Sequence, residues 1–368
     1  MDAETGRAGR VPGGRTARRR RVHLDGVRGH CVPAGRSADE AFGAKVARDV
    51  SPATVQRQAF DQLRAFATAD EPLAPFTTYK LGGPAAVFAV PRDERELARV
   101  GEVARATGLA VLVVGRGSNM LVADSGFPGI AVSLAAMGDW IEFQDTVVRA
   151  GAAVALPVLA RRCSAAGLIG FEWAVGVPGT LGGAVRMNAG GHGSDIAASL
   201  IGVHLYDLQR AQRAWVPVDR LGLRFRGSAL ADHQVVLDAR VQLTHGDPVE
   251  SEAALTEIVR WRREHQPGGQ NAGSVFVNPI PGELPAAVLI DRLGLRGYRV
   301  GGACVSDKHA NFIQAEHGAT AADVRAVMTF VREQVRVHTG FDLRSEVRLV
   351  GFADVMDDVA EHTEGVSW

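Results

Sequence analysis

The sequence predicts a chain of mixed α and β structure, in which helical and strand patterns are joined by glycine-rich loops. Residues 93–107 repeat apolar side chains at helical spacing, and Gly108 is placed to end that helix. Residues 109–114 are an unbroken apolar run that favours a strand, and a glycine loop follows it directly. Residues 203–207 and 235–243 alternate apolar and polar side chains, as half-buried strands do. These observations predict an α+β fold.

The other elements follow from similar patterns along the chain. A weak amphipathic repeat predicts a helix over residues 55–69, which Pro72 and Pro75 would stop. Near the end of the chain, Thr320 and Asp323 have the spacing of a capping box and predict the start of a helix. The further predicted strands are residues 85–90, 129–134, 140–143, 146–150 and 345–350, and the further helices are residues 156–166, 250–264, 284–293 and 320–338.

Composition and cysteine usage limit the class of protein. Apolar residues make up 46% of the chain and 43 residues are glycine, which is typical of a globular protein rich in tight turns. No apolar run reaches the roughly 18 to 20 residues that span a bilayer, and the N-terminus lacks the hydrophobic region of a signal peptide. The 3 cysteines form no metal-binding spacing: Cys163 is expected in a core helix, Cys304 in a glycine-rich turn and Cys31 in a tail. We therefore expect a cytoplasmic protein with no membrane insertion and no metal site.

The net charge of zero hides an uneven distribution along the chain. Residues 1–57 carry 12 Lys and Arg against 6 Asp and Glu, whereas the rest carries 29 against 35. A neutral-to-acidic body argues against a dedicated nucleic-acid-binding protein. The basic segment contains Arg18, Arg19, Arg20 and Arg21 and many glycines, and we expect it to be disordered. It either binds anionic partners, or is inert, or results from a start codon assigned too early.

The first stretch with chemical content is the loop after the strand at residues 109–114, which consists of Gly115, Arg116, Gly117, Ser118 and Asn119. Glycines let backbone N–H groups approach a phosphate closely, and Ser118 and Asn119 can donate hydrogen bonds. The spacing matches neither a dinucleotide-binding fingerprint nor a Walker loop. A tight turn and a phosphate cradle therefore both stay open.

The second stretch covers residues 176–193 and includes Pro178, Gly179, Thr180, Gly182, Gly183, Asn188 and Gly190. It holds more glycines than hairpin turns require, which predicts a backbone wrapped closely around a flat or phosphorylated ligand. Thr180 and Asn188 are the candidate polar contacts to that ligand. A flexible loop is the alternative, although the neighbouring prolines and large apolar residues favour order.

Three shorter signals are weak when each is taken singly. Ser274 follows small residues and leads into an apolar strand, but no nucleophile elbow surrounds it. Its hydroxyl can instead protonate a strongly basic carbanion, if it is held at hydrogen-bond distance. Arg226, beside Phe225, suits recognition of a carboxylate or phosphate, and Glu346 lies near the start of an apolar strand. Turn or surface positions are the alternative for all three.

Together and in this order, these stretches resemble those of the UDP-N-acetylenolpyruvoylglucosamine reductase (MurB) family. The resemblance covers residues 72–351, and residues 271–274 distinguish this family from other flavoproteins that share the first two loops. Residues 297–302 run directly into residues 303–312, as in the shorter, type II branch. The resemblance implies a two-part FAD-binding domain of the PCMH/vanillyl-alcohol-oxidase type and a C-terminal α+β substrate domain.

The resemblance also implies a reaction and roles for the residues. NADPH would reduce FAD, and the enolpyruvyl group of a UDP-sugar would then be reduced to give UDP-N-acetylmuramate for peptidoglycan. Both glycine-rich stretches would hold FAD, Ser274 would be the proton donor, and Arg226 with Glu346 would stabilise the developing enolate. Glu346 should be partly protonated to help an anion, so we expect its pKa to be raised. Arg262, His265 and Asn278 would contact the UDP-sugar, and the protein would be a monomer.

The implied domain boundaries are a tail at residues 1–57, a first FAD-binding subdomain at 58–135 and 340–368, a second one at 136–266, and a substrate-binding domain at 267–339. Phe225 departs from the family pattern, where tyrosine is common, and His265 stands where some relatives have lysine. Two rival hypotheses stay open. One is another flavin-dependent oxidase or dehydrogenase that acts on a hydroxy acid or a sugar, and the other is an inactive relative that binds flavin or UDP-sugar.

Overall fold

The described part of the chain begins with helix α1 (Pro52–Leu63). The Ser51 hydroxyl accepts a hydrogen bond from the backbone N–H of Thr54, and a proline occupies the first helical turn, where no N–H partner is required. The computed structural model describes residues 51–353 and 365–368. The expectation of a disordered tail is thus wrong for residues 52–57, which are helical, and residues 1–50 lie outside the described residues.

Helix α1 ends earlier than predicted, and the chain becomes strand β1 (Ala67–Pro72). β1 pairs antiparallel with β2 (Pro84–Ala89), and the pairing satisfies backbone groups that a helix continued to residue 69 would have used. Beyond β2 the sheet continues with β5 (Phe127–Val132) and β3 (Val111–Val113), which run parallel to β2. The first part is therefore a mixed four-stranded sheet with order β1-β2-β5-β3.

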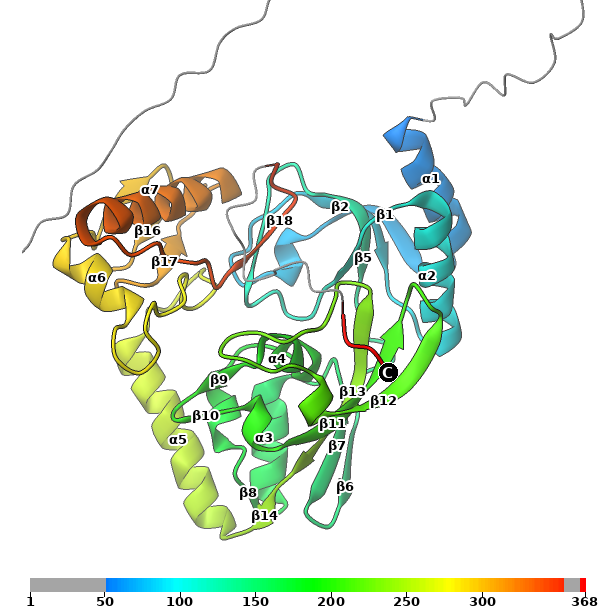
Figure 1. The fold of residues 1–368 in the computed structure, drawn as a ribbon, viewed down its shortest axis with the longest axis horizontal. Coiled ribbons are helices and arrows are strands. Elements are labelled where there is room, and N and C mark those ends of the chain that lie inside the picture. The colour runs from blue at the N-terminus through cyan, green and yellow to red at the C-terminus, as the bar shows by residue number, and fades with distance from the viewer. Residues whose placement is uncertain (1–50, 354–364) are drawn as a thin grey trace, which may run out of the picture. The chain divides into compact units, whose positions relative to one another are not determined.

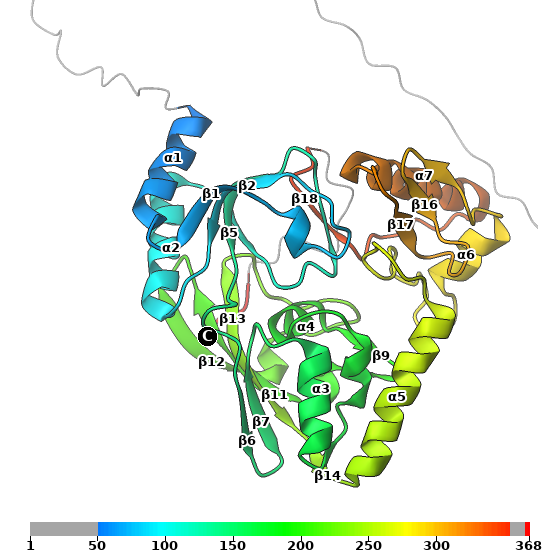
Figure 2. The same cartoon turned by 180° about the vertical axis from the view of Figure 1, so that it is seen from behind.

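Helix α2 (Glu94–Thr107) confirms the helix predicted over residues 93–107. The Asp93 side chain accepts a hydrogen bond from the backbone N–H of Glu96 at the start of the helix. Gly108 ends it in the left-handed conformation, with φ 71°. α1 and α2 lie side by side, next to β1 and β2 (Figures 1 and 2).

The second part is a five-stranded antiparallel sheet with order β12-β11-β13-β7-β6. Its longest strands, β11 (Leu200–Asp207) and β13 (Gln234–Gln242), confirm the strands predicted at residues 203–207 and 235–243. The expectation that they are half-buried is wrong, because most side chains on both faces of each strand are buried. β7 (Val147–Gly151) and β6 (Ile141–Gln144) also match predicted strands. β12 (Gln212–Pro217) was not predicted, because it is an edge strand with mostly exposed side chains and no apolar alternation marks it.

Three helices surround this sheet and lead the chain away from it. α4 (Leu181–Met187) packs against β13 and β7, and α3 (Leu156–Ala165) packs against α5 (Pro248–His265). Figures 1 and 2 show α5 running from the end of the second part, near β14, toward α6. The remaining short strands are β8 (Leu168–Ile169), β9 (Gly190–Gly191), β10 (Ser194–Asp195) and β14 (Thr244–His245), and 3-10 turns cover Ala74–Phe76, Glu172–Gly176, Ile196–Ala198 and Val218–Arg220.

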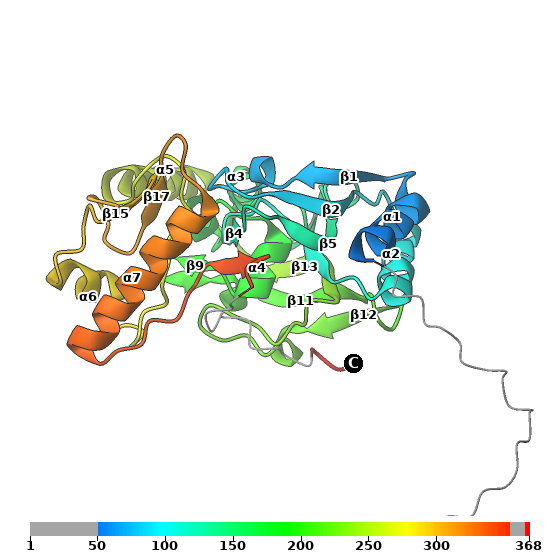
Figure 3. The same cartoon turned by 90° about the horizontal axis from the view of Figure 1, so that it is seen from above.

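The third part is a small α+β unit with its own core. It contains α6 (Ala286–Arg292), α7 (Ala321–Thr339) and an antiparallel sheet of β15 (Arg299–Val300), β16 (Ala303–Val305) and β17 (Ile313–Ala315). One face of α7 is buried in this core, and the helix confirms the one predicted over residues 320–338. Figure 3 shows α6, α7 and β17 grouped at one side of the described chain.

Two local predictions for the third part had different outcomes. The capping box of α7 is confirmed, because the Thr320 hydroxyl accepts from the Asp323 N–H and the Asp323 carboxylate accepts from the Thr320 N–H. The expectation that Cys304 lies in a turn is wrong, because it is the middle residue of β16 and is buried there. Cys163, in contrast, is buried in α3 as expected.

The C-terminal strand returns to the first part. β18 (Arg348–Val350) pairs in parallel with β4 (Met120–Val122), the strand that follows the first glycine loop. Just before β18, Phe276 and Ser345 form a bridge that joins the third part to the same segment. Distant segments of the chain therefore meet at one place.

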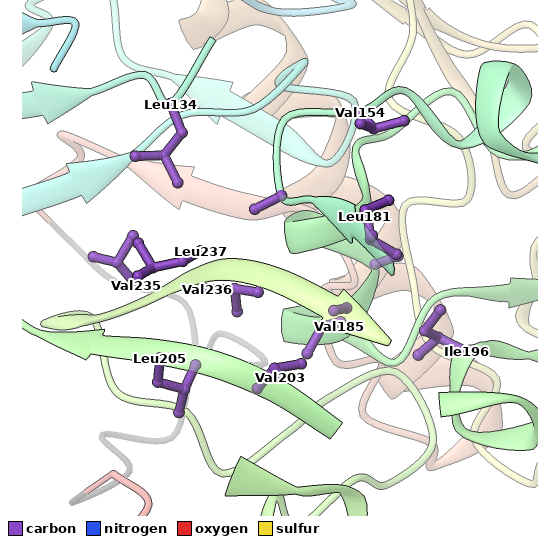
Figure 4. Close-up of a cluster of buried hydrophobic side chains, with 14 of the residues drawn as sticks. Leu134, Val154, Leu181, Val185, Ile196, Val203, Leu205, Val235, Val236 and Leu237 are labelled. Atoms are coloured by element: carbon purple, nitrogen blue, oxygen red, sulfur yellow. The ribbon is translucent and has the colours of Figure 1, made fainter. Parts of the chain in front are cut away.

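The largest core is shared by the first two parts. It includes the inward faces of β11 and β13 and the apolar side chains of α4, among them Val203, Leu205, Val185 and Leu181 (Figure 4). Within the described ranges, no helix is both long and apolar enough to cross a membrane. The same residues contain no group of His, Cys, Asp and Glu side chains that could hold a metal ion.

Candidate active site

A cavity of about 820 Å³ lies among residues from all three parts. Both glycine-rich stretches line it, together with the loop that carries Ser274 and the end of the strand that carries Glu346. The predicted site residues that line it are Gly115, Arg116, Gly117, Ser118, Asn119, Pro178, Gly179, Thr180, Gly182, Gly183, Gly190, Arg226, Arg262, Ser274 and Glu346. The structure thus brings together residues more than two hundred positions apart in the sequence.

The first glycine loop is held by close contacts that exclude other residue types. Gly117 has φ 53°, and a Cβ atom there would lie 2.2 Å from the carbonyl oxygen of Phe76. At Gly115 a Cβ atom would lie 2.7 Å from Oγ1 of Thr180, so the two glycine-rich stretches touch. Asn119 Nδ2 donates to the carbonyl oxygen of Glu346 at 2.8 Å. This loop is therefore an ordered wall that is joined to the C-terminal strand.

The second stretch is ordered as well. The Thr180 hydroxyl accepts from the backbone N–H of Gly183 and begins helix α4, which rules out the alternative of a flexible loop. Gly183 and Gly191 face open space: a Cβ atom at Gly183 would meet only Thr180, at 3.4 Å, and one at Gly191 would meet nothing within 4 Å. Because both glycines line the cavity, larger side chains there would fill it.

Arg226 and Glu346 form an ion pair at the cavity wall. The distance from Arg226 Nε to Glu346 Oε1 is 3.1 Å, and the side chains are 24% and 19% exposed. Arg226 has a left-handed backbone, with φ 57°, and its guanidinium lies over the Phe225 ring, 5.0 Å from the ring centre. Burial raises the pKa of Glu346 to about 7, although Arg226 and Arg344 act to lower it. The direction of this shift agrees with the raised pKa that the sequence led us to expect for Glu346.

Backbone hydrogen bonds hold the segment that follows Ser274 against the segment that carries Glu346. The N–H of Glu346 donates to the carbonyl oxygen of Val275 at 2.7 Å, and the N–H of Val277 donates to that of Arg344 at 3.0 Å. Ser274, the residue before Val275, lines the same cavity. A short antiparallel pairing between the two segments thus explains how these distant residues share one site.

Arg262 marks another region of the cavity, at the end of α5. Its Nε donates to Gln266 Oε1 at 2.8 Å, and burial lowers the pKa of its guanidinium. His192 also lines the cavity, and burial together with Arg262 lowers its pKa. The His192 ring meets Trp261 edge-on, with ring centres 5.0 Å apart.

Three of the predicted site residues do not line this cavity. Asn188 ends α4 in the left-handed conformation and is occupied by internal hydrogen bonds to Asp195, Arg224 and Ala197. His265 is exposed and stacks on Trp261, with ring centres 4.6 Å apart. The Asn278 side chain accepts from the N–H of Ala286 at the start of α6.

Sequence reasoning missed a second charged group in the wall. Asp232 Oδ1 accepts from Arg186 at 2.6 Å and from Arg348 at 2.9 Å, and all three residues line the cavity. Burial alone would raise the pKa of Asp232, but Arg348 and Arg186 outweigh it and the pKa is lowered. Arg348 could have been found, because it lies two residues after Glu346 and alternate residues of a strand share a face. Asp232 carries no comparable signal in the sequence.

These observations fit a dinucleotide with a flat ring system. Two ordered glycine-rich walls line a cavity of about 820 Å³, and at Gly183 and Gly191 a side chain would fill part of that space. Arg116 and Arg262 add positive charge that suits phosphate groups. Residues 84–209 match the model of an FAD binding domain. The fold and the site therefore define a flavin-dependent oxidoreductase with an α+β FAD-binding fold.

Comparison with known proteins identifies the family within this class. Residues 265–350 match the model of the C-terminal domain of UDP-N-acetylenolpyruvoylglucosamine reductase. The reductase of Heliobacterium modesticaldum is 42% identical, over 76% of this chain and 90% of that protein. The reductase of Bacillus subtilis is 36% identical, over 77% of this chain and 93% of that protein. The chain belongs to the UDP-N-acetylenolpyruvoylglucosamine reductase (MurB) family.

A solved structure supports the same assignment. The crystal structure of the reductase from Thermus caldophilus matches this structure with a TM-score of 0.66 and 32% sequence identity. The match covers 77% of this chain and 98% of that chain. The prediction of an FAD-binding domain followed by a C-terminal α+β domain is thus confirmed.

Proposed function

We propose a residue-level account of the reaction of this family, the reduction of UDP-N-acetyl-3-O-(1-carboxyvinyl)-glucosamine to UDP-N-acetylmuramate in peptidoglycan precursor synthesis. FAD is the cofactor and NADPH is the co-substrate. The observation that carries the account is the Arg226–Glu346 pair in the same cavity as Ser274, beside two glycine-rich walls.

The glycine-rich walls hold FAD. The loop Gly115, Arg116, Gly117, Ser118 and Asn119 binds through its backbone N–H groups and polar side chains, which face the cavity. Pro178, Gly179, Thr180, Gly182, Gly183 and Gly190 form the other wall. Asn188 supports this site indirectly, because its Nδ2 donates to the carbonyl oxygen of Arg224, two residues before Arg226.

The residues of this cavity would hold FAD, which in its reduced form would supply the hydride for the vinyl carbon C3 of the substrate. The protein would then have to stabilise negative charge at C2 and in the adjacent carboxylate. Arg226 faces this charge with a guanidinium that is fixed by Glu346 and by the Phe225 ring. Because the pKa of Glu346 is about 7, a large fraction of its carboxyl groups is protonated near neutral pH and can donate a hydrogen bond to the anion.

Ser274 supplies the proton that C2 needs. A hydroxyl is a poor acid, but an enolate-like anion is a strong base, so proton transfer is favourable when the two are at hydrogen-bond distance. Ser274 lines the cavity, and the short backbone pairing with residues 344–346 fixes its loop.

The UDP-sugar is recognised at the α5 end of the cavity. Arg262 presents its guanidinium there and suits the diphosphate. His265 and Asn278 stay predictions as substrate contacts: His265 is one turn from the cavity-lining Trp261, and Asn278 is tied to α6. We further propose that the protein acts as a monomer in the cytoplasm.

The test is an anaerobic assay of the purified protein. Its visible spectrum is recorded, and NADPH oxidation is then followed with and without the enolpyruvyl UDP-sugar. We expect a yellow protein whose sustained NADPH oxidation requires that substrate. A yellow protein that ignores the substrate would contradict the substrate assignment, and a protein that stays colourless after incubation with FAD would contradict the cofactor assignment.

A further inference from the structure

The last residues of the chain dock beside the cavity, after a segment outside the described residues. Val366 is 6% exposed and belongs to the largest core cluster. The Gln234 side chain pairs with both backbone groups of Val366: its Nε2 donates to the carbonyl oxygen at 2.7 Å, and its Oε1 accepts from the N–H at 2.8 Å. Figures 1 and 2 show this C-terminus beside β13, which begins at Gln234.

The fit between the chain end and the residues before β13 is close. Gly365 has φ 91°, and a Cβ atom there would lie 2.8 Å from Gln234 Oε1 and 3.1 Å from Ala231 Cβ. A side chain at position 365 would therefore be strained and would also displace the Gln234 amide. Two buried hydrogen bonds and a residue that must be glycine indicate a specific contact.

The residues that receive the chain end form part of the cavity wall. Gln234 and Asp232 both line the cavity, and the Gln234 N–H donates to the carbonyl oxygen of Ala231. Arg186 reaches this turn twice, with one nitrogen donating to the Ala231 carbonyl oxygen at 2.7 Å and the other to Asp232 at 2.6 Å. Arg348 donates to Asp232 from the C-terminal strand. Residues 231–234 are thus held by Arg186 and Arg348 from the cavity side and by the chain end from the other side.

We propose that Gly365 and Val366 are a clamp that positions residues 231–234, and through Asp232 the guanidinium groups of Arg186 and Arg348, for FAD binding. Both residues lie beyond residues 265–350, the part of the chain that matches the C-terminal family model. Without the clamp, the buried Gln234 amide loses its two bonds to Val366, and the turn that carries Asp232 loses its outer support. This inference rests on the proposed assignment of the cavity to FAD.

The test compares the full chain with a chain that ends at residue 364. FAD is removed from both, and the dissociation constant of added FAD is measured from the quenching of flavin fluorescence. We expect the truncation to weaken FAD binding about tenfold, which corresponds to about 1.4 kcal/mol. Ser367→Ala is the matched control, because Ser367 is exposed in the same segment, and it should leave the dissociation constant unchanged.

A double-mutant cycle separates positioning from a general loss of stability. Asp232→Asn weakens the link to Arg186 and Arg348, so the truncation should cost less additional FAD affinity in that background than in the original chain. Additive losses would overturn the route through Asp232. A truncated chain whose FAD affinity stays within twofold of the full chain would overturn the clamp itself, even if its melting temperature falls.

The truncated chain could fail to fold, and the full chain could fail to bind FAD. If the truncated chain does not fold, Gly365→Val and Val366→Ala provide milder changes to the same contact and are judged by the same affinity criterion. If the full chain binds no FAD at all, the proposed cofactor assignment fails, which is distinct from equal binding by full and truncated chains.

Discussion

Replacement of Glu346 by glutamine tests the central feature of the site, a carboxyl group with a raised pKa. Glutamine keeps an oxygen that can accept from Arg226 but cannot ionise. The pKa of Glu346 is raised from 4.5 to about 7, so ionisation of this largely buried group opposes folding above its unfolded pKa. The folded state holds a proton that the unfolded state has already released, and stability therefore falls as pH rises through this window.

The size of the effect follows from the shift. A rise from 4.5 to about 7 corresponds to about 3 kcal/mol of stability that is present at acid pH and lost by about pH 8. The Glu346→Gln variant has no ionisable group at this position, so its stability should not fall in this way as pH rises. The variant should therefore be more stable than the original protein at about pH 8, and the two should differ less at about pH 5. The difference in melting temperature between the two proteins should change by on the order of 5 °C across that range.

The assay is thermal unfolding of the flavin-free proteins across this pH range, with the exposed Glu252→Gln as the control. The same ionisation should appear in catalysis, since only protonated Glu346 can donate a hydrogen bond to the anion. The rate of sugar reduction should fall as pH rises through about 7 in the original enzyme, and Glu346→Gln should remove that step. Parallel pH profiles for the two proteins, in stability and in rate, would refute the reasoning.

The remaining predictions concern Ser274 and the two glycine-rich walls. Ser274→Ala should keep flavin reduction by NADPH but slow sugar reduction by about 10²- to 10⁴-fold, and single-turnover absorbance of the flavin separates the two half-reactions. Loss of both half-reactions, or of neither, contradicts the role. Gly117→Ala should cost about 1 to 2 kcal/mol from its left-handed backbone alone, and the contact with Phe76 adds to this, so FAD should bind weakly or not at all in a titration. Asn188→Ala should cost about 1 to 3 kcal/mol of stability, because a buried site loses several hydrogen bonds, and an unchanged melting temperature would contradict this.

Local sequence signals predicted the elements that depend on local physics. The helix at residues 93–107 has an N-cap aspartate and a C-terminal glycine, and α7 has a capping box, so their ends are defined by neighbouring residues. Helix α1 was predicted too long, because the residues after it pair with β2 and this pairing is not visible in a window of the sequence. β12 and β4 were missed because one is an exposed edge and the other is only three residues long.

The site shows the same division between local and long-range information. Gly117 is identified by its motif, because close backbone approach restricts the residue type at that position. Thr180 was predicted as a polar contact to the ligand, and the structure shows that its hydroxyl caps α4, a helix that was not predicted. Asp232 and Gln234 have no such marker, since their place in the wall depends on Arg186, Arg348 and the chain end. Asn188 shows that a motif residue can serve the site without facing it, as its side chain holds the backbone beside Arg226.

The position of Glu346 links these observations. Its backbone pairs with Val275 and accepts from Asn119, so the loop that carries Ser274 and the first glycine loop converge on the same residue. Its side chain pairs with Arg226, whose left-handed backbone is supported by Asn188 through Arg224. The carboxyl group is thereby held in a site where burial raises its pKa to about 7, although a guanidinium lies only 3.1 Å away. A carboxyl group held in this way is partly protonated near neutral pH, and its protonated form can donate a hydrogen bond from a fixed position, as stabilisation of a short-lived anion requires.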